Sequence, residues 1–230
     1  LIPLCAVEVL EPEMLNKLPR FQARLQWFLE NRPELAALVS HWEEPGKGKR
    51  RLLSLLRGHR LTCILNRMLD EDEFYSDYGI RSLSKYHEEH PYVFACNGHH
   101  LSVGYQPAES TTHLFGGNSN WRGPIWLPIN YILVESLLKF HTYYTEVFRI
   151  ECPKHSDVFL SLEEIGEHIC SRILSMFEPD ATGTLPIHRQ YAETYQQEHF
   201  QDLILFYEYF HGDNGRGVGA SHQSGWSSLA

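Results

Sequence analysis

The chain has 230 residues, a net charge of −9 and an apolar fraction of 43%, enough for one sizeable hydrophobic core. The negative charge argues against nucleic acid or an anionic membrane as a partner, since both attract basic surfaces. No apolar run approaches the roughly 18 residues that a membrane span needs, so the sequence predicts no membrane segment. The five cysteines are odd in number and widely spaced, which favours reduced thiols, and we expect a cytoplasmic compartment.

Hydrophobic spacing predicts a mainly helical chain. Pro12 follows Glu11 at the start of the first helical pattern, and Pro33 stops that pattern after Asn31. In chain order we expect helices over residues 11–31, 34–42, 130–144 and 162–177, a further helical pattern over 203–210, and a connection over 149–157. Residues 52–56 are apolar but too short to assign, and the acidic stretch 69–84 is typical of a solvated loop.

One β-hairpin is expected in this helical chain. Asn97-Gly98 separates two short β-prone runs within residues 92–106, and this dipeptide is the strongest local hairpin signal. The long loops are rich in aromatic residues, which argues against disorder and for function. We therefore predict an all-α fold with one short β-hairpin and long functional loops.

The most unusual stretch is residues 115–131, FGGNSNWRGPIWLPINY. Asn118 and Asn120 can donate and accept hydrogen bonds, Arg122 offers a fork of donors, and Trp121 and Trp126 supply flat apolar faces. This mixture suits a sugar, which has hydroxyl edges and C–H faces. The alternative is a rigid structural loop, with the arginine bonded to carbonyls and the tryptophans in the core.

A second constellation lies near the end of the chain. Glu208 stands in an apolar run between two tyrosines, and a carboxylate there must be paired, hydrogen-bonded or functional. The glycine-rich segment that follows could close around a ligand through polar side chains at His211, Asp213, Asn214, His222 and Gln223. The alternative is a glutamate on the solvated stripe of a helix. Glu193, in more polar surroundings, is the rival carboxylate.

Other chemistries find no support in the sequence. It has no serine-hydrolase, P-loop, dinucleotide or zinc-protease motif. No histidine pair has the spacing of metal ligands with supporting carboxylates, so we expect neither a metal nor a cofactor.

The motifs GGNSNWRGPIWLPINY, FYEYFHGDNG and GASHQSGW closely resemble the catalytic domain of family 63 glycoside hydrolases. The resemblance extends to IPLCAVEVLEPE and DEDEFYSDYGIRSLSKYH, and so covers nearly the whole chain. It implies an (α/α)6 toroid, of which residues 1–230 would be a single but incomplete C-terminal part. It also implies inverting hydrolysis of a terminal α-glucoside or α-mannoside of small size.

In that mechanism one carboxylic acid protonates the leaving oxygen and a second carboxylate activates water. By motif position, Glu208 matches the general base. Trp121, Arg122, Gly123, Pro124 and Trp126 match the loop of the sugar pocket, and Trp226 matches the Gly-Trp beside the base. Asn118, Asn120, His222 and Gln223 are further substrate-binding candidates, proposed from their chemistry.

The family's general acid is an aspartate that precedes the segment matched here, so we expect it in the rest of the parent domain. We accordingly expect the 230 residues alone not to turn over substrate. The alternative function is a non-catalytic helical domain that binds carbohydrate or serves as a scaffold.

Overall fold

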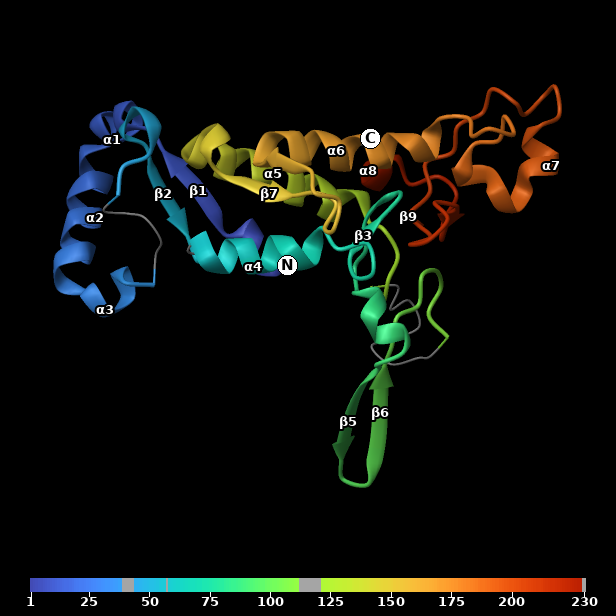
Figure 1. Ribbon diagram of the computed structural model, residues 1–230, viewed down its shortest axis with the longest axis horizontal. Coiled ribbons are helices and arrows are strands. Elements are labelled where there is room, and N and C mark those ends of the chain that lie inside the picture. The colour runs from blue at the N-terminus through green and yellow to red at the C-terminus, as the bar shows by residue number, and fades with distance from the viewer. Residues whose placement is uncertain (39–43, 57, 112–120, 229–230) are drawn as a thin grey trace. The chain divides into compact units, whose positions relative to one another are not determined.

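The computed structural model describes residues 1–38, 44–56, 58–111 and 121–228 (Figure 1). These residues form a mostly helical structure with five small two-stranded antiparallel sheets. The longer α-helices are α2 (Pro19–Asn31), α4 (Gly58–Met68), α5 (Leu127–Tyr144) and α6 (Leu162–Leu174). The predicted mainly helical character is confirmed, the single β-hairpin of the prediction is one of these five sheets, and the toroid stays a prediction. In the described part of the chain, no helix is both long and apolar enough to cross a membrane.

The chain divides into two compact units, which we describe separately. Unit 1 comprises Leu1–Asn66, Ile132–Cys152 and Ser156–Gly166, and unit 2 comprises Arg67–Tyr131, Pro153–His155 and Glu167–Ala230.

In unit 1, three successive α-helices each begin at a proline. Its elements are η1 (Ile2–Cys5), β1 (Val7–Leu10), α1 (Pro12–Lys17), α2, α3 (Pro33–Ala36), η2 (Lys47–Lys49), β2 (Arg51–Ser54), most of α4 and α5, η4 (Thr145–Val147), β7 (Arg149–Glu151), β8 (Phe159–Ser161) and the start of α6. The helix predicted over residues 11–31 is interrupted at Leu18, whose φ of −121° and ψ of 62° are not helical. The cause is Pro19, because a proline ring disfavours helical backbone at the residue before it.

Two of the short β-sheets belong to unit 1. Strands β1 and β2 pair antiparallel, with Val7 opposite Ser54, so the unassigned run 52–56 begins as a strand. Strands β7 and β8 pair with Arg149 opposite Ser161, so the connection predicted over 149–157 contains a strand. Helix α4 was not predicted. Of the helix predicted over 34–42, α3 covers Pro33–Ala36, and residues 39–43 lie outside the described residues.

Unit 2 carries the remaining sheets and the end of the chain. Its elements include β3 (Tyr75–Ser76), β4 (Gly79–Ile80), η3 (Lys85–Glu88), β5 (Tyr92–Cys96), β6 (His99–Val103), η5 (Ser175–Phe177), η6 (Pro186–Tyr191), α7 (Ala192–Tyr195), β9 (Tyr209–Phe210), β10 (Gly217–Val218) and α8 (Ser224–Ser227). The hairpin expected from Asn97-Gly98 is confirmed as β5 and β6, the paired green arrows of Figure 1. Asn97 and Gly98 have φ values of 51° and 78°, as a tight hairpin turn requires.

The helix predicted over residues 203–210 is wrong. Residues 203–207 have no regular structure, Glu208 lies in a bend, and Tyr209 and Phe210 form a strand. Phe210 pairs with Gly217 of β10 and also forms a β-bridge with Ile125. These long-range hydrogen bonds satisfy the backbone groups that a helix would have paired locally, so tertiary contacts override the helical spacing.

Candidate functional site

The site is built around the hairpin of β9 and β10 in unit 2. Ile125 exchanges backbone hydrogen bonds with Phe210, at 2.8 and 2.9 Å, and also bridges to Arg81. This three-way pairing places Trp126, the next residue along the chain, beside Tyr209. Asn130, fully buried, reinforces the arrangement because its side chain exchanges hydrogen bonds with both backbone groups of Ile80. Three segments distant in sequence are therefore held together at β9, directly after Glu208.

Glu208 itself is held by the chain that follows β10. Its backbone N–H donates to the Ala220 carbonyl at 3.0 Å, and the Ala220 N–H donates to Glu208 Oε2 at 3.3 Å. The side chain is half-buried. The carboxylate is thus fixed by one backbone donor and stays accessible.

Gly219 allows the backbone after β10 to come close to the Glu208 carboxylate. It has a φ of +74°, and a Cβ there would lie 2.6 Å from Tyr209 Cε1 and 2.8 Å from Glu208 Oε2. Only glycine combines that backbone conformation with so close an approach. The glycine-rich tail thus brings its backbone against the carboxylate, and its closure around a ligand stays a prediction.

An open groove runs beside this carboxylate. It has a volume of about 570 Å³ and is lined by Tyr191, Thr194, Tyr195, Leu205, Tyr207, Gly219, Ala220 and Ser221. Burial raises the pKa of Tyr207 to about 12, and the neighbouring Tyr195 phenol, with which it shares a hydrogen bond, adds to the shift. The Tyr207 phenol therefore stays protonated at neutral pH, and a tyrosine hydroxyl can both donate and accept a hydrogen bond.

The three tryptophans predicted to bind substrate lie together with Tyr209. Trp126 stacks on Trp121 with ring centroids 4.2 Å apart and on Tyr209 at 4.7 Å, and Trp226 meets Trp126 edge-on at 5.9 Å. Trp126 is only 5% exposed, whereas Trp121 and Trp226 are 48% and 43% exposed. Trp126 therefore serves as the centre of the stack, and only the two outer tryptophans can offer a face to a ligand.

Arg122 and Gly123, which follow Trp121 in the chain, are buried. Arg122 is 3% exposed, its Nη1 donates to Gln106 Oε1 at 3.5 Å, and its carbonyl accepts from the Gln106 N–H at 2.7 Å. The Gly123 N–H donates to Ser82 Oγ at 3.0 Å. These contacts anchor the end of the loop at 115–131. The role of Arg122 in binding hydroxyls stays a prediction, and Asn118 and Asn120 lie outside the described residues.

The other polar candidates are more dispersed. His222 is exposed, and Gln223 is half-buried, with its N–H donating to the Phe206 carbonyl at 2.6 Å. Glu193 is exposed on α7. Glu208 is thus hydrogen-bonded to Ala220, a residue of the groove lining, whereas Glu193 lies on the surface.

Asp213 has a structural environment. Its Oδ1 accepts from Arg81 Nη2 at 3.1 Å, Lys85 Nζ at 3.5 Å and the Tyr105 hydroxyl at 2.9 Å. Burial, the largest effect, raises the pKa of Tyr105 well above its usual range, so the phenol remains a donor. With three donors on one oxygen, Asp213 fixes the turn between β9 and β10.

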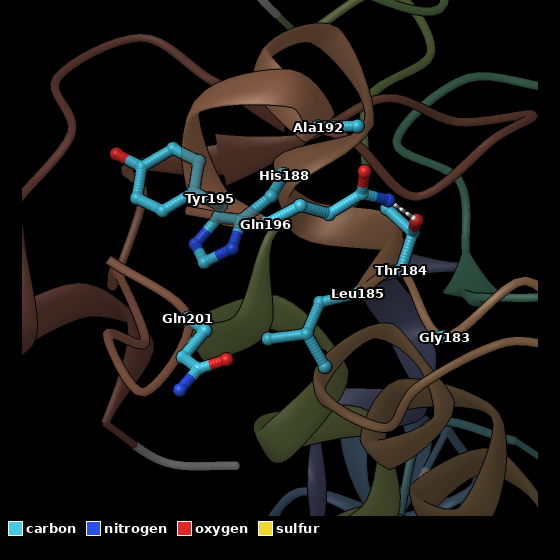
Figure 2. Close-up of a pocket in the computed structure, with 8 residues that line it drawn as sticks. All are labelled: Gly183, Thr184, Leu185, His188, Ala192, Tyr195, Gln196 and Gln201. Carbon is cyan, nitrogen blue, oxygen red and sulfur yellow. Dashed lines mark hydrogen bonds between the residues drawn. The ribbon is translucent and has the colours of Figure 1, made fainter. Parts of the chain in front are cut away.

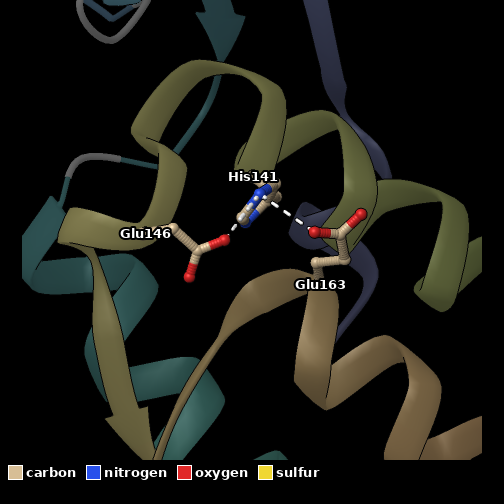
Figure 3. A group of neighbouring side chains, drawn as sticks. All are labelled: His141, Glu146 and Glu163. Carbon is tan, nitrogen blue, oxygen red and sulfur yellow. Dashed lines mark ion pairs between the residues drawn. The ribbon is translucent and has the colours of Figure 1, made fainter.

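One group of side chains in unit 1 has the spacing of metal ligands. His141 Nε2 lies 3.5 Å from Glu146 Oε1 and 3.4 Å from Glu163 Oε2 (Figure 3). Their donor atoms all fall within 4.8 Å of one another, but both glutamates are exposed, and Arg149 Nη2 also pairs with Glu146 at 3.1 Å. An ion-pair cluster accounts for this geometry, and we assign no metal to it.

Several residues that shape the site were not predicted. Tyr195, Tyr207 and Ala220 line the groove, and Tyr209 closes the aromatic stack. The tyrosines beside Glu208 were visible in the sequence, but only as a sign of burial. Ala220 carries no side-chain signal, because it acts through its backbone N–H.

A comparison with protein-family models covers this part of the chain. Residues 51–230 match the model of the glycosyl hydrolase family 63 C-terminal domain, a range that contains Glu208, the groove and the aromatic group.

Three curated proteins are similar in sequence. An uncharacterised protein of Saccharomyces cerevisiae is 47% identical over 232 residues, covering 100% of this chain and 21% of that protein. A probable mannosyl-oligosaccharide glucosidase of Schizosaccharomyces pombe is 23% identical over 170 residues, covering 74% of this chain and 14% of that protein. The mannosyl-oligosaccharide glucosidase of Saccharomyces cerevisiae is 23% identical over 171 residues, with the same coverage of 74% and 14%. The chain therefore spans about a fifth or less of the length of these relatives.

Proposed function

Since this chain belongs to glycosyl hydrolase family 63, we propose that it is the base-carrying part of an inverting α-glycosidase and that Glu208 is the general base. The observation that carries the proposal is the half-buried Glu208 carboxylate, held by the Ala220 N–H beside an open groove. Glu8 and Glu164 also accept backbone N–H groups, so what distinguishes Glu208 is its place beside a groove lined by phenols.

The geometry suits a base that acts through water. Ala220 donates to Oε2, and among the described residues no hydrogen bond reaches Oε1. We place the attacking water at Oε1, which can accept its proton while the Ala220 N–H keeps the carboxylate oriented. Such a base removes the proton as the water attacks the anomeric carbon on the face opposite the leaving group.

The reaction also needs a carboxylic acid that protonates the leaving oxygen. Asp213 is unsuited to this part, because Arg81, Lys85 and Tyr105 already occupy its Oδ1. We assign the acid to the rest of the parent domain.

The substrate that we propose is a terminal α-glucoside or α-mannoside of small size. Two of the relatives are named as glucosidases, whereas the relative with 47% identity is uncharacterised, so the identity of the sugar is not transferred. The half-exposed faces of Trp121 and Trp226 suit the C–H face of a sugar ring. The hydroxyls of the groove tyrosines, with Arg122, Asn118, Asn120, His222 and Gln223, would bind its polar edges.

The test is the anomeric form of the first product. The full-length protein is incubated with α-linked disaccharides of glucose and mannose, and the released sugar is followed by proton NMR from the first minutes. Release of the β-anomer supports inversion, whereas release of the α-anomer would contradict it. Sugar binding without any release would favour the non-catalytic alternative.

The matching variant is Glu208→Gln. It keeps the shape and the Ala220 hydrogen bond but removes the base, so turnover should fall by about 10²–10⁴-fold while sugar binding persists. The control is Glu193→Gln, an exposed carboxylate that should leave the rate unchanged. If the two variants behave in the opposite way, Glu193 is the base.

A further inference from the structure

A second cavity in unit 2 lies beside η6 and α7. It has a volume of about 170 Å³ and is lined by Gly183, Thr184, Leu185, His188, Ala192, Tyr195, Gln196 and Gln201 (Figure 2). This volume is more than enough for several water molecules, and so for a small hydroxylated molecule or one edge of a sugar ring. This cavity and the groove beside Glu208 share one lining residue, Tyr195.

The notable group in this cavity is the imidazole of His188. The residue is 2% exposed, and its Nε2 has no hydrogen-bond partner among the residues that the structure describes. Figure 2 shows the edge of the ring that carries both nitrogens turned toward the space between Leu185 and Gln201. A buried polar atom without a partner costs free energy, so an unpaired nitrogen at a cavity marks a place where a ligand can supply the missing hydrogen bond.

The orientation of His188 is fixed by stacking. Its ring lies 3.8 Å from the Tyr195 ring at an interplanar angle of 16°. Burial lowers the pKa of His188, which favours the neutral imidazole at physiological pH. A neutral imidazole has one nitrogen that accepts and one that donates, which matches a hydroxyl group.

The other polar side chains of the lining are uncharged, and two of them are held by hydrogen bonds. Gln196 Nε2 donates to the Thr184 hydroxyl at 2.9 Å, a bond drawn in Figure 2, and the Thr184 N–H donates to Asp180 Oδ1 at 3.2 Å. Gln201 adds a second carboxamide. No charged side chain is among the lining residues, so the cavity suits a neutral ligand that both donates and accepts hydrogen bonds.

We propose that this cavity is a second binding site, taking a neutral hydroxyl-bearing molecule, a sugar or small polyol, with one hydroxyl hydrogen-bonded to His188. The shared Tyr195 gives the site a physical link to the groove, because its phenol is hydrogen-bonded with Tyr207 there. The ligand is either a free sugar or the outer part of a longer substrate. The inference does not depend on Glu208 being catalytic.

The experiment is saturation-transfer NMR on the full-length protein with glucose, mannose and glycerol as probes, in wild type and two variants. His188→Phe keeps the stacked ring but removes both nitrogens, and it should weaken binding about tenfold or more. Leu185→Phe enlarges a side chain that Figure 2 shows pointing into the cavity and should abolish binding there. Glu208→Gln should leave this binding unchanged, which separates failure of the site from failure of the proposed function.

Two results would overturn the inference: no saturable binding of any probe to the wild type, or wild-type affinity in both variants. In the second case the sugar binds only elsewhere, for example in the groove. Should His188→Phe fail to fold, as judged by circular dichroism, Leu185→Phe carries the test alone.

The two possible ligands, a free sugar and the outer part of a longer substrate, predict different kinetics for His188→Phe. If His188→Phe raises KM for an oligosaccharide and keeps kcat, the cavity holds part of the substrate. If KM is unchanged while binding of the free sugar is lost, the ligand is a separate small molecule. Either result, together with lost binding, supports the site.

Discussion

Unit 2 contains two hairpins of the same antiparallel type in opposite surroundings. In β5–β6, five-residue strands pair from Tyr92 opposite Val103 to Cys96 opposite His99, and nearly every residue is exposed. In β9–β10, two-residue strands pair Phe210 with Gly217, and every strand residue is buried. The longer hairpin follows from its own turn, whereas the shorter one depends on Ile125 and Trp126 from another part of the chain.

This difference bears on the position of Glu208, the carboxylate that we propose as the base. A hairpin that is specified by its turn can form without packing against other segments, so its strand side chains can stay exposed. A hairpin that is specified by packing exists only when distant segments meet, so a residue at its edge is positioned by all of them. Glu208 stands directly before β9 and is positioned in this way. The three predictions below test this contrast between the hairpins, from the largest expected effect to the smallest.

The largest effect should come from removing an aromatic ring from each hairpin region. Trp126→Ala takes away the centre of a buried stack, so the free energy of unfolding should fall by about 3–5 kcal/mol. Phe94→Ala on β5 removes a ring that is 48% exposed, and the change should stay within about 0.5 kcal/mol. Urea unfolding followed by circular dichroism measures both.

Equal losses in these two variants would contradict the contrast, because they would mean that β5 is as firmly packed as β9. Catalytic turnover adds a second readout. It should fall with Trp126→Ala and persist with Phe94→Ala, since only Trp126 contacts the residue that follows Glu208.

The next effect compares a glycine from each hairpin. A Cβ at Gly217 would lie 2.0 Å from Tyr207 Cδ2, so Gly217→Ala forces the ring or the strand to move and should destabilise by about 3 kcal/mol. Gly98→Ala meets nothing within 4 Å and adds only the strain of a φ of +78°, about 1 kcal/mol. Thermal unfolding should show the larger fall in Tm for Gly217→Ala. A larger fall for Gly98→Ala would contradict the view that β9–β10 is the hairpin that depends on close packing.

The same contrast explains what the sequence could predict. Asn97-Gly98 predicts its hairpin because the turn requirement is local. The spacing of Leu203, Ile204, Tyr207 and Phe210 is helical, but it equally suits an irregular segment leading into a buried strand, and only the pairing with Ile125 decides. Local propensity therefore fails at the place where distant contacts determine the backbone.

The site residues follow a similar division. Glu208 could be singled out because a carboxylate in an apolar run needs an explanation, and the family resemblance pointed to the same residue. The stacking order of Trp121, Trp126, Tyr209 and Trp226 could not be predicted, since it joins segments about a hundred residues apart. The backbone donor at Ala220 and the imidazole in the second cavity also require the folded chain.

The smallest effect concerns the pH dependence of β9–β10 through His211, the residue after β9. Burial, and secondarily the positive charge of Arg216, lowers the pKa of His211, while Asp213 and Glu109 oppose the shift. His211 Nδ1 accepts the Asp213 N–H at 3.1 Å, which requires the neutral ring. Because the unfolded chain binds the proton near pH 6.5 and the folded chain only at lower pH, stability present above pH 6.5 should be lost as the pH falls.

His168 and His188 have pKa values lowered by burial in the same direction, so the wild type contains all three contributions. His211→Asn keeps an acceptor for the Asp213 N–H but cannot be protonated. Its urea midpoint should therefore fall less than that of the wild type between pH 7 and about pH 5. Identical slopes would mean that His211 is protonated equally in both states, and that the turn after β9 is more open to solvent than its packing against Arg216 and Asp213 implies.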